Sequence, residues 1–202
     1  MNLTSFRDPK KFPRRISRTA ALLLVVASTV SYVAAQEVTL QLDPAKSTVK
    51  FTLSDVLHTV RGTFTLKKGI LHFDSTSGKV SGEIVVDARS GESGNGVRDR
   101  KMHKEILESD RFPEISFRPT LVEGATASGK SSAKVHGMFS IHGVEREITV
   151  PAEVEIGSDH WSANVHFTIP YEKWGMKNPS TLFLRVSDSV EIDLAAIGSV
   201  MR

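Results

Sequence analysis

Alternation of apolar and polar residues recurs along this chain and constrains its fold more than any other feature. Residues 49–53 and 60–66 place apolar side chains or glycine at every second position, which is the period of a β-strand with two unlike faces. The same pattern returns at residues 80–86, 115–117, 135–141, 148–156, 161–169 and 190–194. About eight strands with one apolar face each must close on themselves or on a second sheet.

Short polar or glycine-containing segments at residues 67–69, 141–143 and 157–159 are read as turns, and such turns favour antiparallel neighbours. Small residues recur among the large hydrophobic ones on the inward faces. These are Gly62, Gly82, Gly137, Ala152 and Ala163. They favour a barrel with an occupied interior, while a fully packed core in which the glycines mark bulges is the alternative.

The first 35 residues have the pattern of a cleaved secretory signal. Six basic residues precede an apolar run at residues 20–33, and small residues follow at Ala34 and Ala35. The run is too short to cross a bilayer as a helix. Removing six basic residues and one acidic residue from the totals of 26 and 23 leaves a net charge of about −2, which argues against nucleic-acid binding. We expect residues 36–202 to form one domain, exported by the general secretory route.

The chain contains no cysteine. Disulfides, a thiolate nucleophile and a zinc–thiolate site are therefore excluded. One segment, residues 94–117, interrupts the β pattern. Met102 and Ile106 lie four residues apart there, as on one face of a helix, within a run of charged residues. The sequence predicts one short helix or helical loop that caps a β structure.

Several stretches of the chain resemble the YceI-like family of lipid- or polyisoprenoid-binding proteins, which are usually periplasmic. The similar stretches are residues 42–51 (LDPAKSTVKF), 60–64 (VRGTF), Arg98-Asp99 followed by Met102-His103, 112–117 (FPEISF), 171–176 (YEKWGM) and 187–192 (SDSVEI). The chain departs from the family pattern at Lys46, at Tyr171 and in the extra residue between Asp99 and His103.

The resemblance implies an all-β fold, an eight-stranded antiparallel, lipocalin-like barrel with a long apolar tail in its interior. A polyisoprenoid, isoprenoid quinone or fatty-acyl lipid is the expected ligand, with no obligatory cofactor. Residues expected to contact the tail are Phe51, Phe64, Leu66, Ile84, Val86, Phe117, Phe139, Trp161, Val165 and Phe167. Residues expected at the head group or barrel mouth are His58, Arg98, Asp99, His103, Trp174 and Lys177.

Three other functions are weighed against lipid binding. A structural or partner-binding β domain with a packed core would use the same apolar faces, and the charges near Arg98 would then make local ion pairs. A metal carrier draws on two histidine pairs six residues apart, His136 with His142 and His160 with His166, which share outward strand faces but lack carboxylates at ligand spacing. A hydrolase lacks the G-x-S-x-G elbow. The sequence does not decide between monomer and dimer, or whether the protein contacts a membrane or membrane protein transiently.

Overall fold

The structure is a computed structural model, and it describes residues 37–54, 58–180 and 185–201. The predicted signal segment and its cleavage point lie outside the described residues. Within the described ranges, no helix combines the length and the hydropathy required to cross a membrane.

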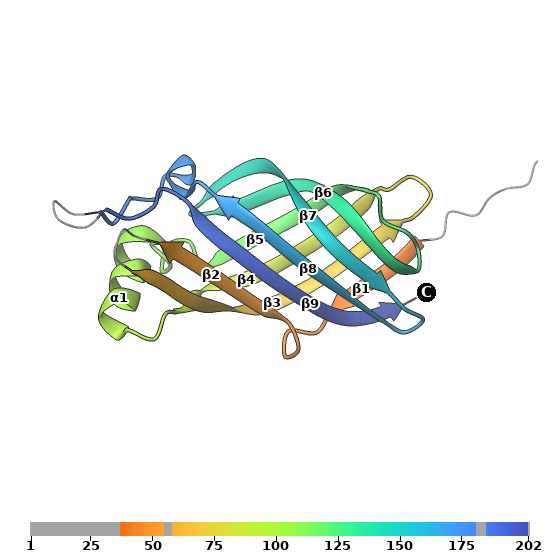
Figure 1. The fold of residues 1–202 in the computed structure, drawn as a ribbon, viewed down its shortest axis with the longest axis horizontal. Helices are drawn as coiled ribbons and strands as arrows, with labels where there is room; N and C mark the ends of the chain where they lie inside the picture. The colour runs from red at the N-terminus through yellow and green to blue at the C-terminus, as the bar shows by residue number, and fades with distance from the viewer. Residues whose placement is uncertain (1–36, 55–57, 181–184, 202) are drawn as a thin grey trace, which may run out of the picture. The chain divides into compact units, whose positions relative to one another are not determined.

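Nine antiparallel strands make up most of the described chain (Figure 1). They are β1 (Glu37–Leu42), β2 (Thr48–Ser54), β3 (Thr59–Asp74), β4 (Val80–Glu92), β5 (Glu114–Glu123), β6 (Gly129–Ile141), β7 (Val144–Ile156), β8 (His160–Ile169) and β9 (Val190–Met201). Strands β2 to β9 form a ring, because β3 pairs with β4 as well as with β2. The predicted all-β, eight-stranded antiparallel barrel is confirmed.

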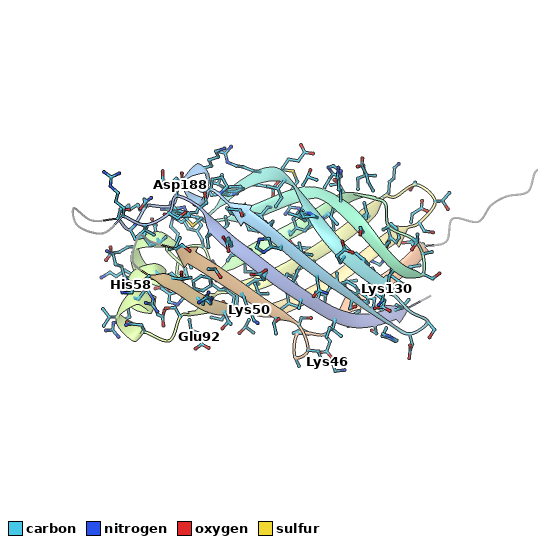
Figure 2. All side chains as sticks on the ribbon, viewed as in Figure 1. Lys46, Lys50, His58, Glu92, Lys130 and Asp188 are labelled. Carbon is cyan, nitrogen blue, oxygen red and sulfur yellow. The ribbon has the colours of Figure 1, made fainter. Side chains whose placement is uncertain are left out.

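The ninth strand, β1, does not enlarge the ring. It pairs with the far half of β3 and with the end of β9, whereas β2 pairs with the first half of β3 and the start of β9. Strands β1 and β2 therefore occupy one position in the ring, one after the other, and residues 43–47 form a loop between them. Lys46 marks this loop in Figure 2.

The segment at residues 67–69 is not a turn, contrary to the sequence prediction. Strand β3 runs continuously for 16 residues, and its register against β4 shifts between Leu66 and Lys68. Lys67 and Lys68 are both exposed, while Leu66 before them and Leu71 after them are buried. A β-bulge of this kind inserts one residue and restores the inward face beyond it.

Three short helical segments complete the fold: α1 (Gly96–Lys101), the π-helical turn η1 (Met102–Ile106) and the 3-10 turn η2 (Tyr171–Trp174). The Asn95 side chain caps α1 by accepting hydrogen bonds from the backbone N–H groups of Val97 and Arg98. The predicted helical interruption of the β pattern is confirmed. We call the end of the barrel that carries α1 and η1 the helical end.

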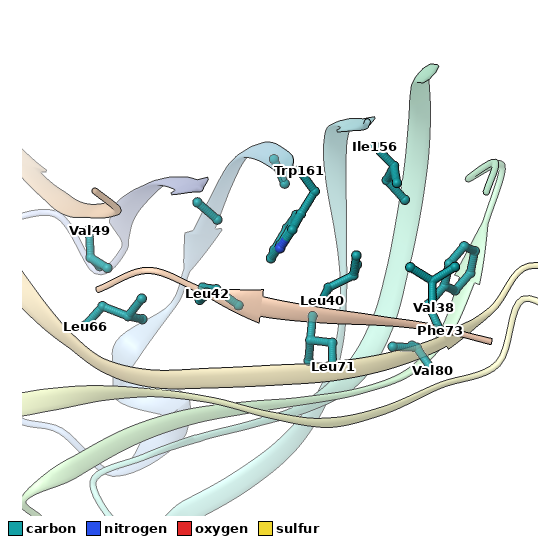
Figure 3. Packing of buried hydrophobic residues seen from close by; sticks show 12 residues of the cluster. Val38, Leu40, Leu42, Val49, Leu66, Leu71, Phe73, Val80, Ile156 and Trp161 are labelled. Carbon is teal, nitrogen blue, oxygen red and sulfur yellow. The ribbon is translucent and has the colours of Figure 1, made fainter. Parts of the chain in front are cut away.

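Two clusters of buried apolar residues stabilise the barrel. The first contains Val38, Leu40, Leu42, Val49, Leu66, Leu71, Phe73, Val80, Ile156, Trp161, Ala163 and Ala196 (Figure 3). We call the end that it fills the packed end. The second cluster lies toward the helical end and contains Ala88, Leu107, Ile115, Phe139, Ile141, Ile169, Tyr171, Trp174 and Met176.

Candidate functional site

A cavity of about 840 Å³ lies inside the barrel. Its lining extends from Phe73 and Trp161 at the packed end to Val97 and Met102 at the helical end. Inward-facing side chains such as Phe64 stay partly exposed, because they border this space rather than one another. The interior is therefore hollow between its two core clusters, unlike the fully packed core that was the alternative reading.

Two inward glycines help to keep the interior open. The ring of Phe51 lies so close to Gly62 that a Cβ there would come within 2.3 Å of it, and the ring of Phe117 would meet a Cβ at Gly137 at 2.8 Å. Each glycine lets an aromatic ring lie flat along the wall instead of projecting across the barrel.

Nine of the ten residues predicted to contact a lipid tail line the cavity: Phe51, Phe64, Ile84, Val86, Phe117, Phe139, Trp161, Val165 and Phe167. Leu66 differs. It is 3% exposed and packs in the first core cluster, outside the lining. Beyond the bulge, the inward face of β3 lines the cavity again at Leu71 and Phe73. Contact of the nine residues with a ligand remains a prediction.

Polar residues of the lining are concentrated at the helical end. Ser93, Asn95, Arg98 and Lys101 come from α1 and the loop before it, and His58 lies at the same end, directly before β3 (Figure 2). Ser116 on β5 is the exception to this concentration. The site therefore has an apolar body and one polar, basic end.

Arg98 and Asp99 are joined through Ser93. The Arg98 guanidinium donates from Nε to Ser93 Oγ at 2.7 Å and from Nη2 to the Ser93 carbonyl at 2.8 Å. Asp99 accepts hydrogen bonds from the backbone N–H and the hydroxyl of the same serine. Asp99 does not line the cavity, whereas Arg98 does. Asp99 thus holds the loop that places Arg98, while two of the five guanidinium donors are used by Ser93.

His103 is engaged within the protein on both ring nitrogens and does not line the cavity. Its Nε2 lies 2.8 Å from the Gly91 carbonyl and its Nδ1 lies 3.0 Å from the hydroxyl of buried Ser109. These bonds connect η1 to the end of β4. The geometry therefore makes His103 an anchor for the helical segment, and its predicted contact with a head group stays a prediction.

Trp174 and Lys177 also lie away from the cavity. Trp174 is 3% exposed, packs edge-to-face on Phe139 with ring centroids 5.8 Å apart, and lines a separate groove on the outer surface. Lys177 is exposed and is not part of the lining. Lys101, in contrast, lines the cavity although it was not predicted. Its spacing of three residues from Arg98 on a helix was the available signal.

The four histidines considered for metal binding do not form a common site. His142 lies in the β6–β7 turn rather than on a strand face, and its side chain is 12% exposed. His160 and His166 each contact a single aspartate, Asp159 and Asp193. Within the described ranges, no three histidine, aspartate or glutamate side chains come together as a metal site would require.

Tyr171 closes part of the helical end. Its hydroxyl donates a 2.6 Å hydrogen bond to the Ser187 carbonyl. Burial raises the pKa of Tyr171 to about 12, and the nearby carboxylates of Glu172 and Asp188 act in the same direction. On the outer wall, a hydrogen bond and charge attraction between Lys67 and Glu114 raise the pKa of the lysine and lower the pKa of the glutamate.

Comparison with known proteins assigns this chain to a family. The model of the YceI-like domain matches residues 40–197, which is almost the whole barrel. The chain belongs to the YceI-like family. A UPF0312 protein of Vibrio parahaemolyticus is 28% identical over 123 residues, covering 58% of this chain but only 62% of the relative. A UPF0312 protein of Pseudomonas putida is 26% identical over 148 residues, covering 69% of this chain and 73% of the relative.

Three solved structures share the fold. A polyisoprenoid-binding domain from Saccharophagus degradans superposes with a TM-score of 0.65 at 16% identity, covering 80% of this chain and 98% of the domain. BcnA from Burkholderia cenocepacia gives a TM-score of 0.64 at 18% identity, covering 77% and 98%. The YceI protein of Campylobacter jejuni gives 0.58 at 17% identity, covering 71% and 86%. At these identities the similarity establishes the barrel alone.

Proposed function

We propose that this protein binds a long apolar lipid chain inside its barrel and holds the polar head of that lipid at the helical end. The observation that carries the proposal is the distribution of residues around the cavity. Aromatic and aliphatic side chains surround most of it, and four of its polar residues lie on or beside α1. An amphiphile with one long tail matches this arrangement in both chemistry and direction.

The tail alone supplies the binding free energy. Burial of one CH₂ group contributes about 0.8 kcal/mol, so a five-carbon prenyl unit contributes about 3 to 4 kcal/mol. Two or three such units offset the loss of translational and conformational freedom on binding. A long chain therefore needs no charged contact to bind, and the head group decides specificity.

The expected ligand is an isoprenoid, an isoprenoid quinone or a fatty-acyl compound. The fold shared with a polyisoprenoid-binding domain supports this class. Together with the predicted export signal, it supports a role as a periplasmic carrier or store of such a lipid, acting by binding and not by catalysis. A structural or partner-binding domain without a lipid ligand is the competing function.

Native mass spectrometry of the protein purified from its own host tests the proposal. We expect a stoichiometric species heavier than the protein alone, and organic extraction should release an isoprenoid, quinone or fatty-acyl compound. Protein that carries no lipid, and that also fails to take up farnesol or palmitate when these are supplied, would favour the structural domain.

The basic residues at the helical end predict a preference for anionic heads. Lys101→Gln removes a charge from the lining without touching the bonds between Arg98 and Ser93. Loss of one charge-assisted contact of about 1 kcal/mol should weaken farnesyl pyrophosphate binding by about fivefold. Farnesol, with the same tail and no charge, is the matched control and should bind unchanged. Equal losses for both ligands would reject a head-group role for this end.

A further inference from the structure

The wall of the barrel is incomplete between β7 and β8. Their backbone pairs run only from Ala152 opposite Val165 to Ile156 opposite Trp161. Beyond Pro151, which has no N–H to donate, residues 144–151 of β7 and 166–169 of β8 have no pairs with each other, although each strand stays paired on its other edge. We call this stretch the lateral slot. It extends from the middle of the barrel to the helical end, and Figure 1 shows β7 curving away from β8 there.

Side chains alone separate the inside from the outside at the lateral slot. A groove of about 580 Å³ lies on the outer surface over it. Four apolar residues line both this groove and the barrel cavity: Ile148, Val150, Phe167 and Ile169. The pairing of β4 with β5 is also short, from Ile84 opposite Phe117 to Asp87 opposite Glu114. At the lateral slot the outer groove and the cavity share these four apolar side chains, so one layer of side chains closes the wall there.

The turn η2 lies across the lateral slot, where its Lys173 and Trp174 line the outer groove. It continues directly from β8 through Pro170, and the hydrogen bonds of Lys173 and Trp174 cross to the other side of the slot, to β6, β7 and the turn between them. Tyr171 bonds instead to Ser187. Arg146 donates from Nε to the Lys173 carbonyl at 2.8 Å, and His142 Nδ1 lies 3.2 Å from the Trp174 carbonyl. The Trp174 indole donates to the Phe139 carbonyl at 3.4 Å. Three side-chain bonds thus replace the missing ladder.

The chemistry of the two openings differs. At the helical end, an apolar chain would have to pass Arg98, Lys101 and the polar loop before α1. Through the lateral slot it would meet the four shared apolar residues once the Trp174 ring had moved aside. A chain that enters through the lateral slot avoids contact with the charged groups, and its polar head can stay at the helical end.

We propose that the lateral slot is the route by which the apolar chain enters and leaves the barrel, and that η2 is its gate, held shut mainly by Arg146. The proposal rests on the proposed lipid-binding function. Opening requires the bonds of η2 to β6 and β7 to break, while the ring of eight strands stays closed at the packed end.

A crosslink across the gate tests this route, since the chain has no cysteine of its own. Arg146→Cys combined with Lys173→Cys places two thiols on the groove, and a short bismaleimide joins them. The probe is all-trans retinol, an isoprenoid alcohol, supplied in phosphatidylcholine vesicles. We expect the bridged protein to load and release retinol at least about tenfold more slowly than the same protein treated with a monofunctional maleimide, at equal affinity.

The matched crosslink joins Glu153→Cys to Asn164→Cys, a directly paired position in the hydrogen-bonded part of the same two strands. It should leave both rates unchanged. Arg146→Ala provides an independent test without any reagent. Loss of one hydrogen bond that holds the gate should speed loading and release together, by about fivefold.

Bridged and singly modified proteins that exchange retinol at the same rate would overturn the proposal and assign the route to the helical end. Slow exchange in both crosslinked proteins would also overturn it, because general stiffening would then be the cause. Failure of the unmodified protein to take up retinol or any other chain would instead refute the proposed function, so the two failures are distinguishable.

Discussion

Glu108 and His142 lie against each other, and they are the two non-glycine residues with positive φ in the described ranges, at +46° and +55°. His142 Nε2 lies 3.4 Å from Glu108 Oε1, and the Phe112 ring covers the imidazole with centroids 4.7 Å apart. The contact joins the loop after η1 to the β6–β7 turn, in which His142 and Gly143 both have positive φ. Two strained turns at the helical end therefore support each other.

Replacement of His142 should separate two contributions to the free energy of unfolding. One is the hydrogen bond of its side chain, and the other is the cost of its left-handed backbone conformation. His142→Ala loses the bond to the Trp174 carbonyl, about 1 kcal/mol, and places alanine in a left-handed conformation at a further cost of about 1 kcal/mol. His142→Asn loses only the first part, because asparagine tolerates that conformation. Urea unfolding should therefore rank asparagine between histidine and alanine. Equal losses for the two variants would contradict this division.

Tyr171 should lose its proton at a higher pH than a free tyrosine, and no second tyrosine of the exported protein should overlap with its titration. The chain has two tyrosines, and Tyr32 lies in the predicted signal, so a protein of residues 36–202 contains only Tyr171. Its pKa is raised from 10.0 to about 12 because burial disfavours the phenolate. Its stabilising contribution is therefore complete below pH 10 and is lost as the pH rises toward 12. Tyrosinate absorbance should report the titration, and the alkaline loss of stability should be smaller in Tyr171→Phe. A midpoint near 10 in the folded protein would contradict the burial.

The two tryptophans should respond differently to a tail that quenches only at contact. Trp161 lines the cavity at the packed end, whereas Trp174 lines only the outer groove. A fatty-acyl chain brominated near its tail end quenches tryptophan only near contact, so the bound bromolipid should quench Trp161 strongly. Trp174→Phe should retain most of the quenching, and Trp161→Phe should lose most of it. The reverse result would mean that the tail does not reach the packed end.

Val165→Phe should stabilise the protein while it blocks binding. Val165 lines the cavity and is partly exposed to it, so a larger side chain fills open space and should add about 1 kcal/mol to the free energy of unfolding. In a fully packed core the same change would cost about 1 to 3 kcal/mol. Thermal unfolding and retinol titration measure the two effects. A destabilised variant with normal binding would contradict the cavity.

Two control variants test whether the effects of Val165→Phe come from filling the cavity. Asn164→Phe adds the same ring on the exposed side of β8 and should leave binding unchanged. Leu66→Ala removes a side chain that is core and not lining, so it should lower the free energy of unfolding by about 2 to 5 kcal/mol and leave the affinity of the folded protein intact.

The ring and its inward faces could be predicted because a period of two assigns every side chain to one of two faces. Nine of the ten residues predicted to contact a tail lie on the cavity wall, and their contact with a ligand stays a prediction. Strand β1 has the same alternation, and its Val38, Leu40 and Leu42 are buried. The sequence does not distinguish the bulge at Lys67 and Lys68 from a turn, because two lysines before a glycine occur in both.

The partners of the polar residues could not be predicted. His103 bonds to Gly91 and Ser109, and nothing in their spacing indicates that a π-helical turn brings them together. Trp174 was expected at the mouth, with Lys177, because an indole can pack against a lipid tail. Its position over the lateral slot depends on where the pairing of β7 with β8 stops, and that is a property of the assembled ring.

Strand β9 pairs with β1, β2 and β8, so the last strand of the chain closes both ends of the barrel. No interior exists until synthesis has passed residue 190, and before then the edges of β2 and β8 lack their shared neighbour. Such a delay exposes apolar strands for almost the whole time the chain is being made. A nascent chain of this protein should therefore depend on holding chaperones until β9 emerges, and loss of β9 should send the chain to proteolysis rather than to a partly active form.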